Sequence, residues 1–255
     1  MRIVRFKQGR RRTYGIVEGE RVFAADGDPI KGLKKGAFAG NLKDLQFLPP
    51  IEPTKILAIG RNYLDHIKEL GAGDPSEEPI MFIKPNTVLR AHGDAIVMPA
   101  VAGRVDYEGE LVAVIGKQAK NVPEKLALDY VLGYTCGNDV TARDLQRKDG
   151  QWTRGKGFDG FGPIGPVLLT AARPEGRHIV TRVNGKAVQE SNTDLLIFNV
   201  ARLVSFISYV MTLYPGDIIF TGTPSGIGPV KPGDVMEVEI EGVGILRNPV
   251  VAEKK

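Results

Sequence analysis

Cysteine, histidine and tryptophan are scarce in this 255-residue chain, and their scarcity limits its chemistry. The single cysteine, Cys136, excludes an internal disulfide and any metal cluster built from cysteines. A His-rich zinc site would need nearly all of the three histidines. We therefore expect any bound metal to be held by oxygen ligands, as Mg²⁺, Mn²⁺ and Ca²⁺ are.

Long apolar runs are also lacking. The most apolar stretch, residues 195–214, is interrupted by Asn199, Arg202 and Ser205, so it does not predict a membrane span. No apolar stretch of the signal-peptide type follows the basic residues 1–7. We expect a cytoplasmic protein that does not contact a membrane.

Neither sign of charge dominates: 34 Lys and Arg stand against 30 Asp and Glu. The two signs are interspersed, so the formal net charge of +4 does not by itself indicate nucleic-acid binding. Residues 9–12 are basic and predict a solvated hairpin tip, with an anion-binding patch as the alternative. Nucleic-acid binding would need clustered positive charge interleaved with aromatics, and Trp152 is the single tryptophan, so we expect no nucleic-acid partner.

Proline divides the chain near residue 50. Residues 1–47 predict a small β-rich domain, with strands at 2–6, 13–17 and 21–24 and a short helix near 42–47. Residues 48–53 hold three prolines and predict a stiff linker, because proline blocks both helix and sheet ladder. The main domain is expected at 54–255.

The main domain has many more predicted strands than helices. Strands are expected at 56–59, 81–83, 96–98, 111–115, 131–135, 166–170, 179–183, 217–221, 235–240 and 244–248. Helices are expected at 122–130 and 194–212, and Asn184-Gly185 predicts a hairpin turn. Because strands and helices do not alternate, the pattern favours a β-rich α+β fold over a doubly wound sheet.

Two glutamates stand two residues apart before an apolar strand. Glu108 and Glu110 would project from one face, and their repulsion is relieved most simply by a divalent cation. Solvated carboxylates on an edge strand are the alternative, but the apolar continuation at 111–115 favours the metal. Asp139, at the end of another apolar strand, offers a third oxygen ligand or the N-cap of a short helix over 141–146.

Cationic and amide side chains follow Asp139. Arg143 and Gln146 are three residues apart, on one face of a helical turn, and Lys156 lies among glycines. Beside a carboxylate-held metal these groups would suit a small acid with chelating oxygens. A solvated basic loop is the alternative.

Two further segments carry candidate groups. His66 and Glu69 are i and i+3 on a predicted helical turn, where a carboxylate can orient an imidazole for proton transfer; a surface pair is the alternative. Residues 216–228 end a strand in a glycine-rich turn without a phosphate-loop pattern. Its backbone N–H groups and Thr223 could bind a carboxylate, or the turn could be purely structural.

Taken in order, these motifs resemble the fumarylacetoacetate hydrolase superfamily, in particular its short bacterial members. The resemblance covers residues 53–250. It rests on GRNYxxHxxE at 60–69, FxKP at 82–85, DYExEL at 106–111, NDVTARDLQ at 138–146, WTRGKGFD at 152–159 and GDIIFTGTPSGIG at 216–228.

The resemblance implies a mixed β-sandwich roll with a small N-terminal β-rich appendage, a homodimer, and Mg²⁺ or Mn²⁺ as cofactor. It implies that the metal ligands are Glu108, Glu110 and Asp139. It implies that His66 and Glu69 transfer protons, with Lys156 also catalytic. Substrate oxygens would be held by Arg143, Gln146 and Lys156, and Thr223 would lie near the substrate carboxylate.

The resemblance also implies an enzyme acting on 2-oxo or 2-hydroxy-2-enoic (di)carboxylic acids, with a metal that stabilises an enolate. Isomerisation of the 2-hydroxyhepta-2,4-diene-1,7-dioate type, C–C hydrolysis of acylpyruvates, and decarboxylation or tautomerisation of oxaloacetate all share that intermediate. We favour the first two, on a diacid from aromatic catabolism. A non-catalytic scaffold is a remote alternative, since the ligand carboxylates and the His/Glu pair are all present.

Overall fold

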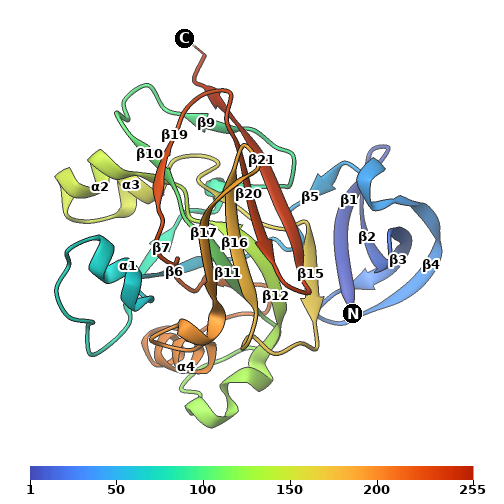
Figure 1. Ribbon diagram of the computed structural model, residues 1–255. Helices are drawn as coiled ribbons and strands as arrows, with labels where there is room; N and C mark the ends of the chain where they lie inside the picture. Colours follow the sequence, from blue (N-terminus) through green and yellow to red (C-terminus); the bar gives the residue numbers. More distant parts are fainter. Residues whose placement is uncertain (255) are drawn as a thin grey trace.

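Strands dominate the computed structural model, which describes residues 1–254 (Figure 1). An 11-stranded sheet has the order β4-β3-β2-β1-β15-β12-β11-β18-β6-β7, with β5 paired to β1. Its strands are β1 (Arg2–Gln8), β2 (Arg11–Glu18), β3 (Arg21–Asp28), β4 (Gly32–Asn41), β5 (Phe47–Leu48), β6 (Ile56–Gly60), β7 (Ile80–Lys84), β11 (Gly109–Ile115), β12 (Val131–Asn138), β15 (Val167–Thr170) and β18 (Ile218–Phe220).

Smaller sheets complete the strand structure. A five-stranded sheet, ordered β17-β16-β20-β21-β9, contains β9 (Ile96–Met98), β16 (His178–Val183), β17 (Lys186–Asn192), β20 (Val235–Ile240) and β21 (Gly244–Ala252). A three-stranded sheet contains β10 (Val105–Tyr107), β13 (Thr141–Ala142) and β19 (Gly228–Val230), and β8 (Leu89–Arg90) pairs with β14 (Gly162–Pro163).

The main core lies between the 11-stranded and five-stranded sheets. Leu111 and Cys136 of the larger sheet share one buried cluster with Ile179 and Val238 of the smaller sheet. Helix α4 (Val200–Val210) adds Leu203, Val204 and Ile207 to the same cluster. The predicted β-rich α+β fold is confirmed, because apolar strands are buried on facing sheets rather than covered by alternating helices.

Helices are few and short. They are α1 (Leu64–Glu69), α2 (Arg143–Asp149), α3 (Thr153–Lys156), α4, and the 3₁₀ turns η1 (Leu42–Asp44), η2 (Asn86–Val88), η3 (Glu124–Tyr130) and η4 (Thr193–Leu195). Helices α1, α2 and α3 lie on the side of the molecule away from strands β1–β4 (Figure 1). Among the described residues, no helix is long and apolar enough to cross a membrane.

Two of the predicted helices differ from those observed. The helix expected over 194–212 begins only at Val200, because the Asn199 side chain caps it by accepting a hydrogen bond from the Arg202 backbone N–H at 2.8 Å. The helix expected over 122–130 is the 3₁₀ turn η3, which begins directly after Pro123.

The N-terminal strands continue the large sheet. Strand β1 pairs antiparallel with β15, so the sheet runs from residues 2–48 into the rest of the chain. The hairpin tip predicted at 9–12 is shorter in the structure: residues 9–10 form the exposed turn between β1 and β2, and the exposed residues 11–12 already belong to β2. Strand β4 was not predicted, because it is mostly exposed and lacks an apolar alternation. The helix predicted near 42–47 is limited to the single turn η1.

Candidate metal and substrate site

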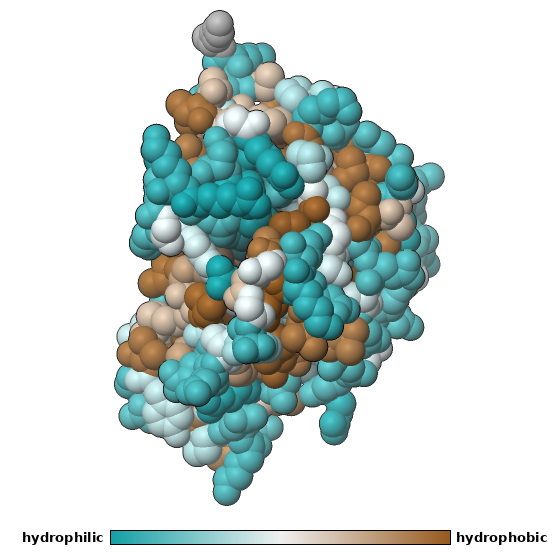
Figure 2. Space-filling view, turned by 60° about the vertical axis from the view of Figure 1, so that its left-hand side comes forward, coloured by the Kyte–Doolittle hydropathy of each residue, from teal (hydrophilic) through white to brown (hydrophobic). Residues whose placement is uncertain are grey.

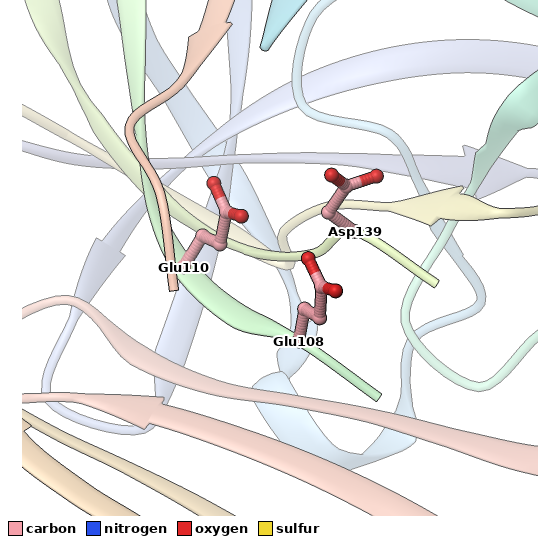
Figure 3. A group of neighbouring side chains, drawn as sticks. All are labelled: Glu108, Glu110 and Asp139. Carbon is pink, nitrogen blue, oxygen red and sulfur yellow. The ribbon is translucent and has the colours of Figure 1, made fainter. Parts of the chain in front are cut away.

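The pairing of β11 with β12 brings three carboxylates together. Gly109 lies opposite Asn138, and the Asp139 backbone N–H donates to the Glu108 carbonyl at 2.8 Å. Glu108, Glu110 and Asp139 each offer one oxygen, and these oxygens lie within 4.8 Å of one another (Figure 3). All three residues are at most 4% exposed. Asp139 is not a helix N-cap, since α2 starts at Arg143 without a side-chain cap.

Two of these carboxylates have positively charged partners. Lys156 Nζ donates to Glu108 at 2.7 Å and to Asp139 at 2.6 Å. Arg143 also pairs with Glu108, and Lys84 pairs with Asp139. Burial alone would raise the pKa of Glu108, but Lys156 and Arg143 outweigh it and hold that pKa well below its usual range.

Glu110 has no such partner among residues 1–254. Its one hydrogen bond there comes from the Gly222 backbone N–H, at 2.7 Å. Burial, together with the charges of Asp139 and Glu108, raises the pKa of Glu110 well above its usual range. A buried carboxylate needs a cation or a proton, and three converging carboxylates are the donor set of Mg²⁺ or Mn²⁺. The residues present therefore fit a divalent cation held by Glu108, Glu110 and Asp139.

The pKa values of the two buried lysines, Lys84 and Lys156, shift in opposite directions. Burial lowers the pKa of Lys84, and Asp139 only partly offsets this. Burial would also lower the pKa of Lys156, but Asp139 and Glu108 outweigh it, and the net shift is upward. Lys156 is therefore held as an ammonium group beside the carboxylates.

Helix α1 positions the histidine and its acidic partner. His66 Nδ1 and a Glu69 carboxylate oxygen are 3.0 Å apart, and His66 is 4% exposed. The other Glu69 oxygen accepts from the Gly226 backbone N–H at 3.0 Å, which connects α1 to the loop after β18. The predicted pairing of His66 with Glu69 is present, and the imidazole is buried rather than on an open surface.

A cavity of about 300 Å³ joins these groups. Seven of the nine predicted site residues line it, namely His66, Glu108, Glu110, Arg143, Gln146, Lys156 and Thr223. Asp139 and Glu69 are not among the lining residues, but they hydrogen-bond to Lys156 and His66, which are. The face carrying α1, α2 and α3 is turned forward in Figure 2, where hydrophilic side chains surround smaller hydrophobic patches. The structure brings the predicted residues together, and their individual roles remain predictions.

The polar residues that line the cavity differ in how many of their hydrogen bonds are made within the protein. Arg143 donates to Asp106 at 2.9 Å and to the Gln146 side-chain oxygen at 2.7 Å, so its guanidinium is held in one orientation. The Thr223 hydroxyl accepts from Gln189 at 2.9 Å and donates to the Gly109 carbonyl at 3.0 Å. Hydrogen bonds within the fold thus use much of the Thr223 hydroxyl's capacity.

Sequence reasoning missed several residues of the site. Lys84 and Asp106 belong to the quoted motifs FxKP and DYExEL but were given no role, although both are fully buried and charged. A charge at the end of an apolar strand, as in Met81–Lys84, was the available signal. Arg61, Arg147 and Trp152 also line the cavity; Arg61 and Trp152 belong to the quoted motifs GRNYxxHxxE and WTRGKGFD but were given no role.

Comparisons with known proteins show which family the chain resembles over most of its length. The family model described as fumarylacetoacetate (FAA) hydrolase C-terminal matches residues 55–251, and one described as Rv2993c-like, N-terminal, matches residues 1–50. An uncharacterized protein of Archaeoglobus fulgidus is 59% identical over 210 residues, 82% of this chain and 84% of that protein. The human mitochondrial oxaloacetate tautomerase FAHD2B is 40% identical over 90% of this chain and 78% of its own length.

A solved structure extends the similarity to the whole chain. The 2-hydroxyhepta-2,4-diene-1,7-dioate isomerase from Mycobacterium marinum has a TM-score of 0.92 and 40% identity, and the match covers 100% of both chains. The C-terminal family model spans well over half of the chain, including every residue of the carboxylate cluster and the His–Glu pair. The chain therefore belongs to the fumarylacetoacetate hydrolase family of enzymes.

Proposed function

We propose that this chain is a divalent-metal-dependent enzyme that shifts a proton within a 2-oxo or 2-hydroxy-2-enoic dicarboxylic acid, as an isomerase or tautomerase. The observation that carries the proposal is Glu110, a buried carboxylate without a cationic partner among residues 1–254, beside Glu108 and Asp139 in a cavity that also holds His66. The relatives named as a dienedioate isomerase and an oxaloacetate tautomerase both act on diacids, which supports this substrate class.

Glu108, Glu110 and Asp139 would hold Mg²⁺ or Mn²⁺. When bound, the metal supplies Lewis-acid polarisation of the substrate's 2-oxo group. Fixed cationic and amide donors complete the binding of substrate oxygens. Gln146 uses its side-chain oxygen to accept from Arg143, and within residues 1–254 its NH₂ group has no hydrogen-bond partner, so it can donate to the substrate.

The His66–Glu69 pair moves the proton. With Nδ1–H donating to Glu69, Nε2 of neutral His66 carries the lone pair that accepts a proton from the substrate carbon. The electron pair of that C–H bond becomes part of the enolate, and Lys156 and Arg143 stabilise its negative charge. His66 then returns the proton to a different carbon or to oxygen, so no atom is gained or lost overall.

Hydrolysis of an acylpyruvate C–C bond is the second candidate. The same pair could deprotonate a water molecule, because His66 lines the cavity and Glu69 fixes its ring. Decarboxylation of oxaloacetate is a further alternative, since it passes through the same enolate. A role in aromatic catabolism goes with the dienedioate and acylpyruvate reactions.

Product-resolved proton NMR distinguishes these reactions. The enzyme with Mg²⁺ is offered acetylpyruvate, oxaloacetate and 2-hydroxyhepta-2,4-diene-1,7-dioate separately, each with an EDTA control. We expect Mg²⁺-dependent isomerisation or faster enol–keto exchange, with deuterium entering carbon in D₂O and no carbon lost. Release of pyruvate would indicate hydrolysis or decarboxylation, and absence of turnover with either Mg²⁺ or Mn²⁺ would contradict the proposal.

Two variants separate the metal from the proton transfer. His66→Ala should lose turnover by about 10²–10⁴-fold, the usual contribution of general acid–base catalysis, yet keep the thermal stabilisation that Mg²⁺ confers. Glu108→Ala should lose both. If His66→Ala turns over normally, the assignment of the proton-transfer pair is wrong.

We also propose that the enzyme is a homodimer. Large apolar side chains such as Tyr209, Val210 and Leu195 are more than half exposed, which is consistent with a covered surface in an assembly. Light scattering coupled to size-exclusion chromatography measures the mass directly. A mass near that of one chain at micromolar concentration would contradict a stable dimer.

A further inference from the structure

We propose that Arg61 and Arg147 form a subsite for the second carboxylate of the substrate, so that the cavity selects dicarboxylates over monocarboxylates. The proposal rests on the proposed function, because it assigns the far end of the same substrate. Both arginines line the cavity, and neither belongs to the carboxylate cluster or to the groups that surround it.

Neither guanidinium is occupied by the fold. Within residues 1–254, the side chains of Arg61 and Arg147 make no hydrogen bond or ion pair, whereas Arg143 is bound by Asp106, Glu108 and Gln146. The cavity also holds the carboxylates of Glu108 and Glu110, but neither arginine pairs with them, so both guanidiniums can attract an anionic ligand. A guanidinium binds a carboxylate through two parallel hydrogen bonds, which makes a carboxylate a fitting occupant.

The position of Arg147 places the subsite toward the cavity mouth. On α2, Arg147 follows Arg143 by four residues, which is one helical turn or about 6 Å along the axis. Arg143 is 4% exposed and touches Glu108, whereas Arg147 is exposed. Like charges at this spacing are unfavourable on a helix, so the fold gains nothing from the pair. The exposed end of α2 therefore presents a free cation one turn away from the buried carboxylates.

The backbone at Arg61 is held in an unusual conformation. Its φ is +57°, in the left-handed region that residues other than glycine rarely adopt. Strain of this kind persists where the surroundings over-determine it and is concentrated at binding and catalytic sites. Here the neighbours on both sides are fixed, since Gly60 packs against Trp152 and the Asn62 side chain bonds to the Phe198 and Thr221 carbonyls.

An apolar wall lies in the same cavity. Trp152 lines it, and its indole packs edge to face on Phe82 with centroids 5.2 Å apart. Leu70 and Ile59 are the other apolar lining residues. Hydrocarbon between two carboxylates would find contact here, while the 2-oxo acid end meets the carboxylate cluster and the other end meets Arg61 and Arg147. The whole cavity thus suits a small dianion with an apolar spacer.

Binding of two probes that differ only at the distal end tests the subsite. Isothermal titration in the presence of Mg²⁺ compares 2-oxoadipate, which has a distal carboxylate, with 2-oxohexanoate, which has the same chain and a distal methyl group. We expect the diacid to bind about 10- to 100-fold more tightly, the range of one charge-assisted hydrogen-bond pair. Arg147→Gln and Arg61→Gln should each reduce that preference, and the double variant should abolish it, without weakening 2-oxohexanoate.

A matched control stands next to Arg147. Lys148→Gln removes one positive charge from the same helix at a residue that does not line the cavity, and it should leave both affinities unchanged. Equal binding of the two probes to the wild type, or an equal loss for both probes in the arginine variants, would overturn the subsite. So would failure of both probes to bind.

The outcome is separable from that of the proposed reaction. Titration requires no turnover, so a preference for the diacid that depends on Arg147 would stand even if the NMR assay showed hydrolysis or no reaction. Conversely, isomerisation with equal binding of the two probes would leave the reaction intact and remove the subsite.

Discussion

At the scale of single residues, the site is defined by which buried charges are matched and which are not. Lys156, Lys84 and Arg143 neutralise Glu108 and Asp139, and Glu110 is left with one backbone N–H. Removing either member of a buried pair strands the other charge, which costs far more than the pair itself contributes. Glu110, which lacks a cationic partner within residues 1–254, is therefore the residue most informative about the metal.

Glu110→Gln is expected to affect thermal stability differently in the metal-free and the metal-bound protein. In EDTA at pH 8 we expect the midpoint of thermal unfolding to equal or exceed that of the wild type, because the neutral amide needs neither a buried charge that Glu108 and Asp139 repel nor the uptake of a proton. In Mg²⁺ the variant should lack the stabilisation shown by the wild type. Differential scanning fluorimetry measures both. A large loss of stability in EDTA would show that Glu110 is already matched by a cation of the protein.

Cys136 should be unreactive in the native protein. Burial raises the pKa of its thiol to about 12, and the residue is fully enclosed in the main core. Ellman's reagent at pH 8 should therefore modify no thiol in the native protein and one in denaturant. Rapid modification without denaturant would contradict the enclosed position.

The same shift in pKa predicts alkaline destabilisation. The unfolded thiol loses its proton near pH 8.5, whereas the folded thiol keeps it, so the unfolded state binds fewer protons and stability falls as pH rises from about 9 toward 12. The contribution is about 1.4 kcal/mol per pH unit in that window. The loss of unfolding free energy between pH 9 and pH 10.5 should therefore be smaller in Cys136→Ala than in the wild type, and urea titrations at the two pH values measure it.

At the scale of elements, the link from β6 to α1 controls the shape of the cavity. A Cβ atom at Gly60 would lie 2.3 Å from the Trp152 ring, which is far inside contact distance. Glycine at the end of β6 thus allows the indole to approach the backbone closely. The connection sets the position of Arg61, of α1 and of Trp152 together.

Gly60→Ala should displace Trp152 and disturb the site. We expect red-shifted tryptophan emission, since Trp152 is the only tryptophan in the chain, and a fall in kcat/KM of at least about tenfold, the usual result of a misplaced wall. Trp152→Phe supplies the reference without indole emission. An unchanged emission spectrum and unchanged kinetics would mean that the indole has room to move aside at no cost.

At the scale of the whole molecule, the N-terminal strands and the site-bearing part share one sheet. Strand β1 pairs with β15, and Ile3 is buried in one cluster with Leu168. Removing β1 would expose the edge of β15 together with apolar side chains worth about 1.5–3 kcal/mol each when fully buried. The division of the chain into two domains at residues 48–53 remains a prediction from the sequence. The pairing of β1 with β15 joins the two predicted domains in one sheet.

Deletion of residues 1–50 is expected to lower stability while sparing the metal site. The carboxylate cluster is built by β11 and β12, which remain, so Mg²⁺ should still raise the unfolding midpoint of the truncated protein. Its midpoint in EDTA should be several degrees lower than that of the full chain. Thermal scans of both proteins, with and without Mg²⁺, measure this. An unchanged midpoint would mean that residues 1–50 fold and unfold independently.

Much of the fold was predictable because the main strands carry local apolar runs. Strand β20 was predicted at its observed bounds, and the Asn184-Gly185 turn was predicted from two residues that both adopt positive φ. Strand β4 and the late start of α4 were not, since an exposed strand and a capped helix start depend on neighbours rather than on periodicity.

Local patterns in the chain were enough to indicate an oxygen-ligated cation and the side chains around it. Scarce cysteine and histidine left oxygen donors, and the spacing of Glu108 and Glu110 in an apolar strand already pointed to a shared cation. Which cationic side chains neutralise the buried carboxylates depends on contacts that form only in the folded chain. Lys84 and Asp106 join the site, and Arg61 and Arg147 face one cavity, because sheet register and helix packing bring together residues far apart in the chain, and no local pattern encodes those contacts.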